Sequence, residues 1–257
     1  MIPMKKLIPI LFFASFLIIQ FSCKPDPTLE GTTDVELVFK GKYADEVFMI
    51  NQEYDYEGNP IRFDQFNFYI SNVVLVKEIV GNPEETEVLE IDFVDLSFKP
   101  ADIDDATKGF SITAPNVPVG DYSGIKINLG VTSDLNKTSW EDYGNGHPLR
   151  KSGHYWSAWN SFIFSKTEAK IDIDSDGSFA HKISYHTGAD DAYRTKFFAK
   201  DITLEEDATT QVSFSVDVKM MFDDIDVMTE TGTHNIGDLS LVNEIMDNLQ
   251  EKVIDIE

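Results

Sequence analysis

Hydrophobic and polar residues alternate along most of the chain after Asp34. In QVSFSVDVKMMF (211–222), every second residue from Val212 to Met220 is apolar and the residues between them are polar or charged. GIKINLGV (124–131) alternates in the same way. Because successive side chains of a strand point to opposite faces of a sheet, this pattern predicts half-buried strands. Further strands are predicted at 35–39, 66–76, 87–96, 162–173, 179–186 and 197–204.

Turn signals separate these strands, and a different period follows them at the end of the chain. Segments such as GNPEE and DSDGS punctuate the strands, and no helices alternate with them. This organisation predicts an all-β fold, an antiparallel β-sandwich. From Leu239 to Val253, apolar residues recur every three or four positions, which predicts a C-terminal helix with Asp238 as its N-cap. We expect a single domain over residues 34–257.

The N-terminus has the pattern of a secretion signal. Two lysines precede the apolar run LIPILFFASFLIIQF, which is short and early for a membrane span. Residues 1–22 resemble a bacterial lipoprotein signal in which Ser22 precedes a lipidated Cys23, although Gln20 stands where leucine is usual. Plain signal-peptidase cleavage is the alternative. Residues 23–33, rich in proline and threonine, are predicted to be a flexible tether.

These features place the protein in the cell envelope, as an outer-membrane or periplasmic lipoprotein held by its lipid anchor. The chain carries 45 Asp and Glu against 21 Lys and Arg, a net charge of −24, so nucleic acid is not an expected partner. Cys23 is the single cysteine, and once lipidated it leaves no thiol for catalysis, a disulfide or a metal. No hydrolase, phosphate-loop, zinc-protease or dinucleotide motif is present, so we expect no enzyme.

One acidic turn resembles the start of a calcium loop. Asp172, Asp174 and Asp176 alternate before Gly177, and their hard oxygens would suit Ca²⁺. The bidentate glutamate expected eleven residues after Asp172 is absent, since Ile183 stands there. A hairpin turn with solvated acids is therefore the favoured interpretation, and calcium is the alternative.

Histidines and tryptophans gather in one part of the chain. His147, His154, His181 and His186 fall within forty residues, and neutral imidazole is a common ligand of copper and zinc. His186 follows His181 by five positions, an odd spacing, so on one regular strand the two side chains point to opposite faces. Both can bind one ion only if a bulge intervenes.

The tryptophans allow two interpretations. Trp156 and Trp159 could be buried anchors of the sandwich, or, with Trp140, exposed platforms that stack on sugars. On a straight strand, residues three apart face opposite sides, which weakens a platform shared by Trp156 and Trp159. A surface glycan-binding lipoprotein is accordingly the second functional hypothesis.

Five ordered segments span most of the chain after residue 34: FNFYISNVVLV (66–76), GDYSGIKINLGVTSDLN (120–136), GHYWSAWNSFIFSKTEAK (153–170), SYHTG (184–188) and SVDVKMMF (215–222). Together they resemble the MbnP-like copper-binding proteins. The resemblance implies an envelope β-sandwich, often a lipoprotein, that binds copper in metal uptake, storage or handling. In known members, a MauG-like dihaem partner enzyme oxidises a tryptophan to kynurenine beside the histidine ligands.

The resemblance assigns roles to particular residues. His186 matches the histidine of the family's HiG motif, and Glu168 matches the acid of its klEG motif. Trp156 and Trp159 match the oxidisable aromatic pair, here W-x-x-W where the family has W-x-W. His154 lies where a further ligand could sit. The resemblance thus implies copper held by His154, His186 and Glu168.

The hairpin around DSDG sets an expectation for this site. Strands centred on that turn would place Lys166 opposite His186 and His181 nearer the turn. We therefore expect His186 to converge with His154 or Trp156, on the order of 10 Å or less between Cα atoms for two ligands of one ion. His181 should lie at the surface.

Overall fold

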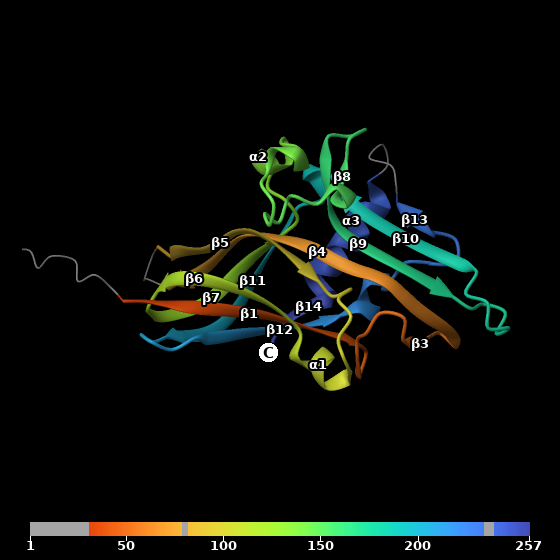
Figure 1. Cartoon of the computed structure of the whole chain (residues 1–257), viewed down its shortest axis with the longest axis horizontal. Coiled ribbons are helices and arrows are strands. Elements are labelled where there is room, and N and C mark those ends of the chain that lie inside the picture. Colours follow the sequence, from red (N-terminus) through yellow and green to blue (C-terminus); the bar gives the residue numbers. More distant parts are fainter. Residues whose placement is uncertain (1–30, 79–81, 234–238) are drawn as a thin grey trace, which may run out of the picture. The chain divides into compact units, whose positions relative to one another are not determined.

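Two β-sheets dominate residues 31–78, 82–233 and 239–257, which the computed structural model describes (Figure 1). The smaller sheet has the strand order β14-β12-β1-β2, and β6 also pairs with β1. Its strands are β1 (Thr32–Tyr43), β2 (Glu46–Val47), β6 (Phe110–Pro118), β12 (Thr210–Asp217) and β14 (Ile254–Ile256).

The larger sheet has the order β11-β7-β4-β9-β10-β13. Strands β3 and β5 also pair with β4, and β8 pairs with β9. Its strands are β3 (Glu53–Tyr56), β4 (Asn59–Lys77), β5 (Glu84–Asp95), β7 (Gly120–Leu129), β8 (Tyr155–Trp156), β9 (Ser161–Ile171), β10 (His181–Gly188), β11 (Arg194–Leu204) and β13 (Gly232–Thr233).

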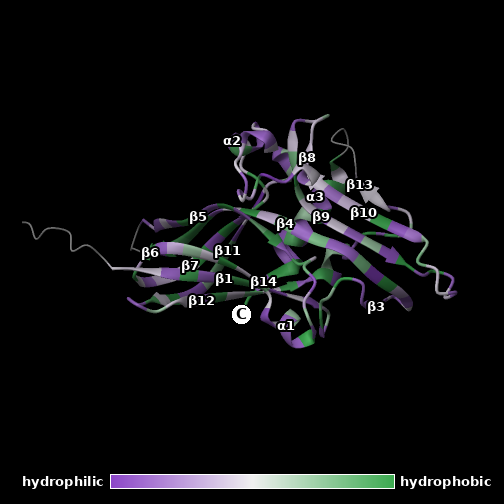
Figure 2. Ribbon diagram, viewed as in Figure 1, coloured by the Kyte–Doolittle hydropathy of each residue, from purple (hydrophilic) through white to green (hydrophobic). Residues whose placement is uncertain are grey.

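Aromatic side chains join the two sheets. The Phe39 ring of β1 lies 6.0 Å from Phe68 of β4 and 5.0 Å from Phe214 of β12. Hydrophobic and hydrophilic residues alternate along these strands in Figure 2, as expected when one face of each strand is buried. The predicted β-sandwich is confirmed, although β1–β12 and β10–β13 pair in parallel.

Helices cover parts of the sandwich. They are α1 (Ile103–Lys108), α2 (Ser133–Asn136) and α3 (Ser240–Asn248), which continues into a π-helical turn, Leu249–Val253. Short 3-10 helices lie at Trp140–Asp142, Ser152–His154, Asp190–Ala192 and Val218–Phe222. No helix within the described residues is long and apolar enough to cross a membrane.

The C-terminal helix is confirmed, with two differences in detail. Leu239 is its N-cap residue and makes no capping side-chain hydrogen bond, while Asp238 lies outside the described residues. The helix does not end the chain, because β14 follows and pairs with β12. The last residues of the predicted strand at 212–220 form the 3-10 helix from Val218.

The domain begins slightly earlier than expected. β1 starts at Thr32, so the end of the predicted tether belongs to the sheet. The predicted signal and Cys23 lie outside the described residues. The predicted hairpin register is confirmed: His186 pairs with Lys166, and His181 with Ile171.

Candidate metal centre

A row of polar residues crosses three neighbouring strands of the larger sheet. Lys166 of β9 pairs with Asn67 of β4 on one side and with His186 of β10 on the other. Paired residues project from the same face of a sheet, and adjacent strands lie about 4.8 Å apart. The three side chains therefore stand side by side on one face.

The segment 140–160 lies over this face and is called the covering segment below. Tyr155 packs its ring 5.1 Å from Phe162 at the start of β9. Lys166 donates from Nζ to the Gly153 carbonyl oxygen at 2.6 Å. Because Gly153 directly precedes His154, this contact brings His154 to the row of Asn67, Lys166 and His186.

His154 is buried among aromatic rings and held by one hydrogen bond. Its ring lies 4.7 Å from Phe93 and 6.2 Å from Tyr69, edge-on to both. Nε2 lies 2.9 Å from Asn67 Oδ1. An amide oxygen only accepts hydrogen bonds, so Nε2 carries the proton and Nδ1 carries the lone pair. No described residue makes a hydrogen bond to that Nδ1.

The electrostatics keep His154 neutral. Burial, together with the smaller effects of Lys166, Lys151 and His186, lowers its pKa to about 3. At neutral pH the imidazole is thus an uncharged base, which is the form that binds a metal ion.

His186 has a comparable arrangement on β10. Its Nε2 lies 2.7 Å from Glu168 Oε1 and 3.4 Å from Ser184 Oγ. The carboxylate accepts a hydrogen bond from Nε2–H, the contact by which an outer carboxylate orients a histidine ring. Thr233 Oγ1 accepts from His186 N at 2.9 Å and donates to His186 O at 2.7 Å, which fixes the backbone beneath the ring.

The two tryptophans meet across a turn. Trp159 N donates to Trp156 O at 3.0 Å, closing the turn between β8 and β9. Their ring centroids lie 3.9 Å apart at 80°, and Trp156 lies 6.0 Å from the His186 ring. On a straight strand W-x-x-W would separate the rings, but here the two residues flank a turn, so the rings meet. Rings at 80° do not form a coplanar sugar platform.

The described residues bring two imidazoles, and not three preassembled ligands, to this face of the sheet. Both histidines direct Nε2 to an oxygen, the pattern by which outer partners orient metal-binding histidines. Glu168 serves His186 as that partner. Among the residues that the structure describes, no group of three or more His, Cys, Asp or Glu could hold a metal ion. The ligand set His154, His186 and Glu168 is therefore not assembled here as three donors.

The calcium-like turn is occupied by its own backbone. Asp172 is buried, and its oxygens accept from Asp176 N at 3.2 Å and Gly177 N at 2.8 Å. Asp176 accepts from Ser178 N at 2.7 Å, and Asp174 is exposed. These contacts describe a hairpin turn, as the favoured interpretation expected.

The other aromatic and imidazole candidates lie in structural contacts. We expected His181 at the surface, but it is only partly exposed. Its Nε2 bonds to Val227 O at 2.8 Å. His147 stacks on Tyr143, with centroids 4.2 Å apart. Trp140 lies under the Arg150 guanidinium at 4.6 Å.

Two residues of the site escaped the sequence analysis as functional groups. Asn67 is a buried amide between two phenylalanines in FNFY, and such a polar residue in an apolar strand signals a buried partner. Lys166 was placed opposite His186, but its position between the two histidines needed the pairing of β4 with β9.

The comparisons with known proteins follow this geometry. The family model described as MbnP matches residues 32–240. The chain belongs to the MbnP family. Among solved structures, MbnP from Methylosinus trichosporium is similar, with a TM-score of 0.53 and 13% identity over 75% of this chain and 78% of that chain. At this identity the likeness shows the shared fold. No curated protein sequence matches the chain.

Proposed function

We propose that this MbnP-family protein binds copper in the cell envelope through His154 and His186, in metal uptake, storage or handling and without catalysis of its own. One observation carries the proposal: two buried histidines on one face of the sheet each bond through Nε2 to an oxygen. The hydrogen bond to Asn67 leaves His154 with Nδ1 as its donor atom, and we infer that the His186 imidazole supplies the second nitrogen.

The geometry and the number of donor atoms decide which oxidation state of copper such a site prefers. Two neutral imidazoles in near-linear geometry suit Cu(I), whereas further oxygen or nitrogen donors would favour Cu(II). Glu168 orients His186 and supplies a nearby negative charge. Trp156, beside His186, is the aromatic residue that a MauG-like dihaem partner would oxidise.

The test of copper binding uses the full-length chain with Cys23→Ser in every variant, so that the single thiol cannot bind the metal. We expect submicromolar copper binding by calorimetry. His186→Ala and His154→Ala should each weaken binding at least about a hundredfold, because one imidazole cannot hold the ion alone.

His181→Ala is the matched control, because His181 lies on the same strand but bonds to Val227 O. It should bind copper as the parent does. Absence of copper binding by the parent, or equal loss in the His181 and His186 variants, would contradict the proposal.

We further propose that lipidated Cys23 anchors the protein to a membrane of the envelope. Intact mass of the protein from its host would show the lipid and any oxidised tryptophan. Cys23→Ala should move the protein from the membrane fraction to the soluble fraction. Retention of that variant in the membrane fraction would argue for another mode of attachment.

A further inference from the structure

Lys166 places a positive charge between the two candidate ligands. It is the central member of the row formed with Asn67 and His186, and Asn67 holds the His154 ring. With strands about 4.8 Å apart, its Cα lies about 5 Å from that of each neighbour. The ammonium is half-buried and bonds to Gly153 O at 2.6 Å, beside the His154 backbone.

The electrostatics of the neighbours agree with this position. Lys166 is the largest charged contributor to the lowered pKa of His154, after burial. Burial lowers the pKa of Lys166, and the Glu168 carboxylate acts against that lowering. The ammonium is thus close to His154 on one side and to the carboxylate that orients His186 on the other.

We propose that Lys166 sets the charge selectivity of the site, so that the two histidines accept monovalent Cu(I) and discriminate against divalent ions such as Zn²⁺. This inference rests on the proposed copper function. An unbalanced carboxylate beside two imidazoles would attract a divalent ion such as Zn²⁺ more strongly than a monovalent one. Lys166 balances the Glu168 charge, and its repulsion acts twice as strongly on a divalent ion as on a monovalent one.

The test compares metals across matched variants, all carrying Cys23→Ser. Lys166→Met removes the charge and keeps the length of the side chain, whereas Lys166→Arg keeps the charge. Lys170→Met removes a lysine charge from the same face of β9, where Lys170 pairs with Asp64 at 2.6 Å. Cu(I) affinity is measured by competition with a chromophoric cuprous chelator, and Zn²⁺ affinity by competition with a zinc chelator.

We expect Lys166→Met to lower the ratio of Cu(I) to Zn²⁺ affinity about tenfold or more, mainly through tighter Zn²⁺ binding. Lys166→Arg and Lys170→Met should keep the ratio of the parent. If the parent binds Cu(I) and Lys166→Met leaves the ratio unchanged, the inference is wrong while the proposed function stands. If the parent binds no copper, the proposed function is wrong as well.

A second variant covers failure of Lys166→Met to fold, which circular dichroism and thermal melting would reveal. Glu168→Gln removes the balancing negative charge and leaves Lys166 in place. Any disturbance of the His186 ring lowers the affinity for both metals, but the charge change lowers the Zn²⁺ affinity more. The ratio of Cu(I) to Zn²⁺ affinity should rise about tenfold. An unchanged ratio would overturn the inference.

Discussion

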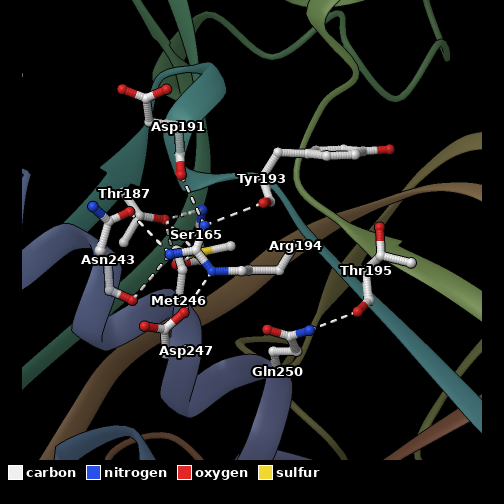
Figure 3. Close-up of polar contacts among 10 residues, drawn as sticks. All are labelled: Ser165, Thr187, Asp191, Tyr193, Arg194, Thr195, Asn243, Met246, Asp247 and Gln250. Atoms are coloured by element: carbon white, nitrogen blue, oxygen red, sulfur yellow. Dashed lines mark hydrogen bonds and ion pairs between the residues drawn. The ribbon is translucent and has the colours of Figure 1, made fainter.

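The two faces of the β9–β10 hairpin use polar side chains in opposite ways. On the face under the covering segment stand Lys166 and His186. On the other face their chain neighbours Ser165 and Thr187 bond to each other at 2.8 Å, and Thr187 Oγ1 donates to Met246 Sδ of α3 at 3.1 Å (Figure 3). Alternation along two strands thus puts one set of polar groups against a helix and the other against a loop.

The helix face is closed by hydrogen bonds. Figure 3 shows Arg194 joining β11 to α3: Nε donates to Asp247 Oδ1 at 2.6 Å and Nη2 to Asn243 Oδ1 at 2.9 Å. Nη1 donates to Asp191 O at 2.8 Å in the preceding 3-10 helix. A guanidinium satisfied on all sides has a structural role and offers nothing to a ligand.

The face under the covering segment, the loop face, holds a ring nitrogen with an unused lone pair. His154 uses one ring nitrogen for Asn67 and retains the lone pair of the other, while burial keeps the ring neutral. The difference teaches a criterion: a buried polar group whose bonds exhaust its capacity is structural, and one that retains a lone pair can bind. Three changes test that criterion.

The largest expected effect is on the helix face. Met246→Ala should lower the free energy of unfolding by about 3 kcal/mol, because Met246 is fully buried and truncation leaves a cavity. Urea unfolding followed by tryptophan fluorescence measures it, with partly exposed Met228→Ala as the control. Copper affinity of the folded protein should not change. A loss of affinity without a loss of stability would erase the distinction between the two faces.

The second effect is a pH dependence on the loop face. His154 has a pKa of about 3 when folded, against about 6.5 in the unfolded chain. Between these values the unfolded state binds a proton that the folded state does not. The stability due to neutral His154 is therefore complete above pH 6.5 and is lost as the pH falls toward 3, by up to about 1.4 kcal/mol per pH unit.

Urea midpoints at pH 7.5, 6 and 5 measure this dependence. His154→Gln retains a donor for Asn67 and does not titrate, so the parent should lose stability more steeply than the variant as the pH falls. The carboxylates titrate in both proteins, so their contributions to the pH dependence cancel in the comparison. His181→Gln is the control. Parallel curves for the parent and His154→Gln would show that the His154 ring is not held neutral by burial.

Local pattern predicted the parts of this arrangement that lie within one hairpin. Period-two alternation and the DSDG turn together gave the pairing of Lys166 with His186, because a turn centre and two regular strands determine the register. The same alternation separates the two faces. It cannot tell which face meets a helix and which meets a loop, since both faces of β9 are largely buried.

Contacts across the chain were out of reach of local pattern. Asn67 and His154 are separated by 87 positions, and no periodicity in either segment encodes their meeting. The W-x-x-W motif was considered on a straight strand, but Asn160 has a positive φ of 47° and ends a turn there. Only the paired strands show that Trp156 and Trp159 approach each other.

The smallest expected effect concerns the tip of the hairpin. There the sequence resembles a calcium-binding loop, whereas the structure shows Asp172 bonded to the backbone of the turn. Both carboxylate oxygens of Asp172 accept hydrogen bonds from backbone N–H groups of the turn, so we expect Asp172 to have a structural role. Asp172→Ala should lower the free energy of unfolding by about 1 kcal/mol through loss of these bonds. Gly177, at φ +84°, would remain free to make the turn.

Thermal unfolding with and without Ca²⁺ tests the structural role of Asp172. A ligand that binds only the folded state raises its stability with concentration. Since the Asp172 oxygens are already bonded to the turn, millimolar Ca²⁺ should leave the thermal midpoint of the parent unchanged, and the Asp172→Ala difference should be the same with Ca²⁺ or with a chelator. A calcium-dependent rise in the thermal midpoint of the parent that Asp172→Ala abolishes would show instead that the turn binds Ca²⁺ through Asp172.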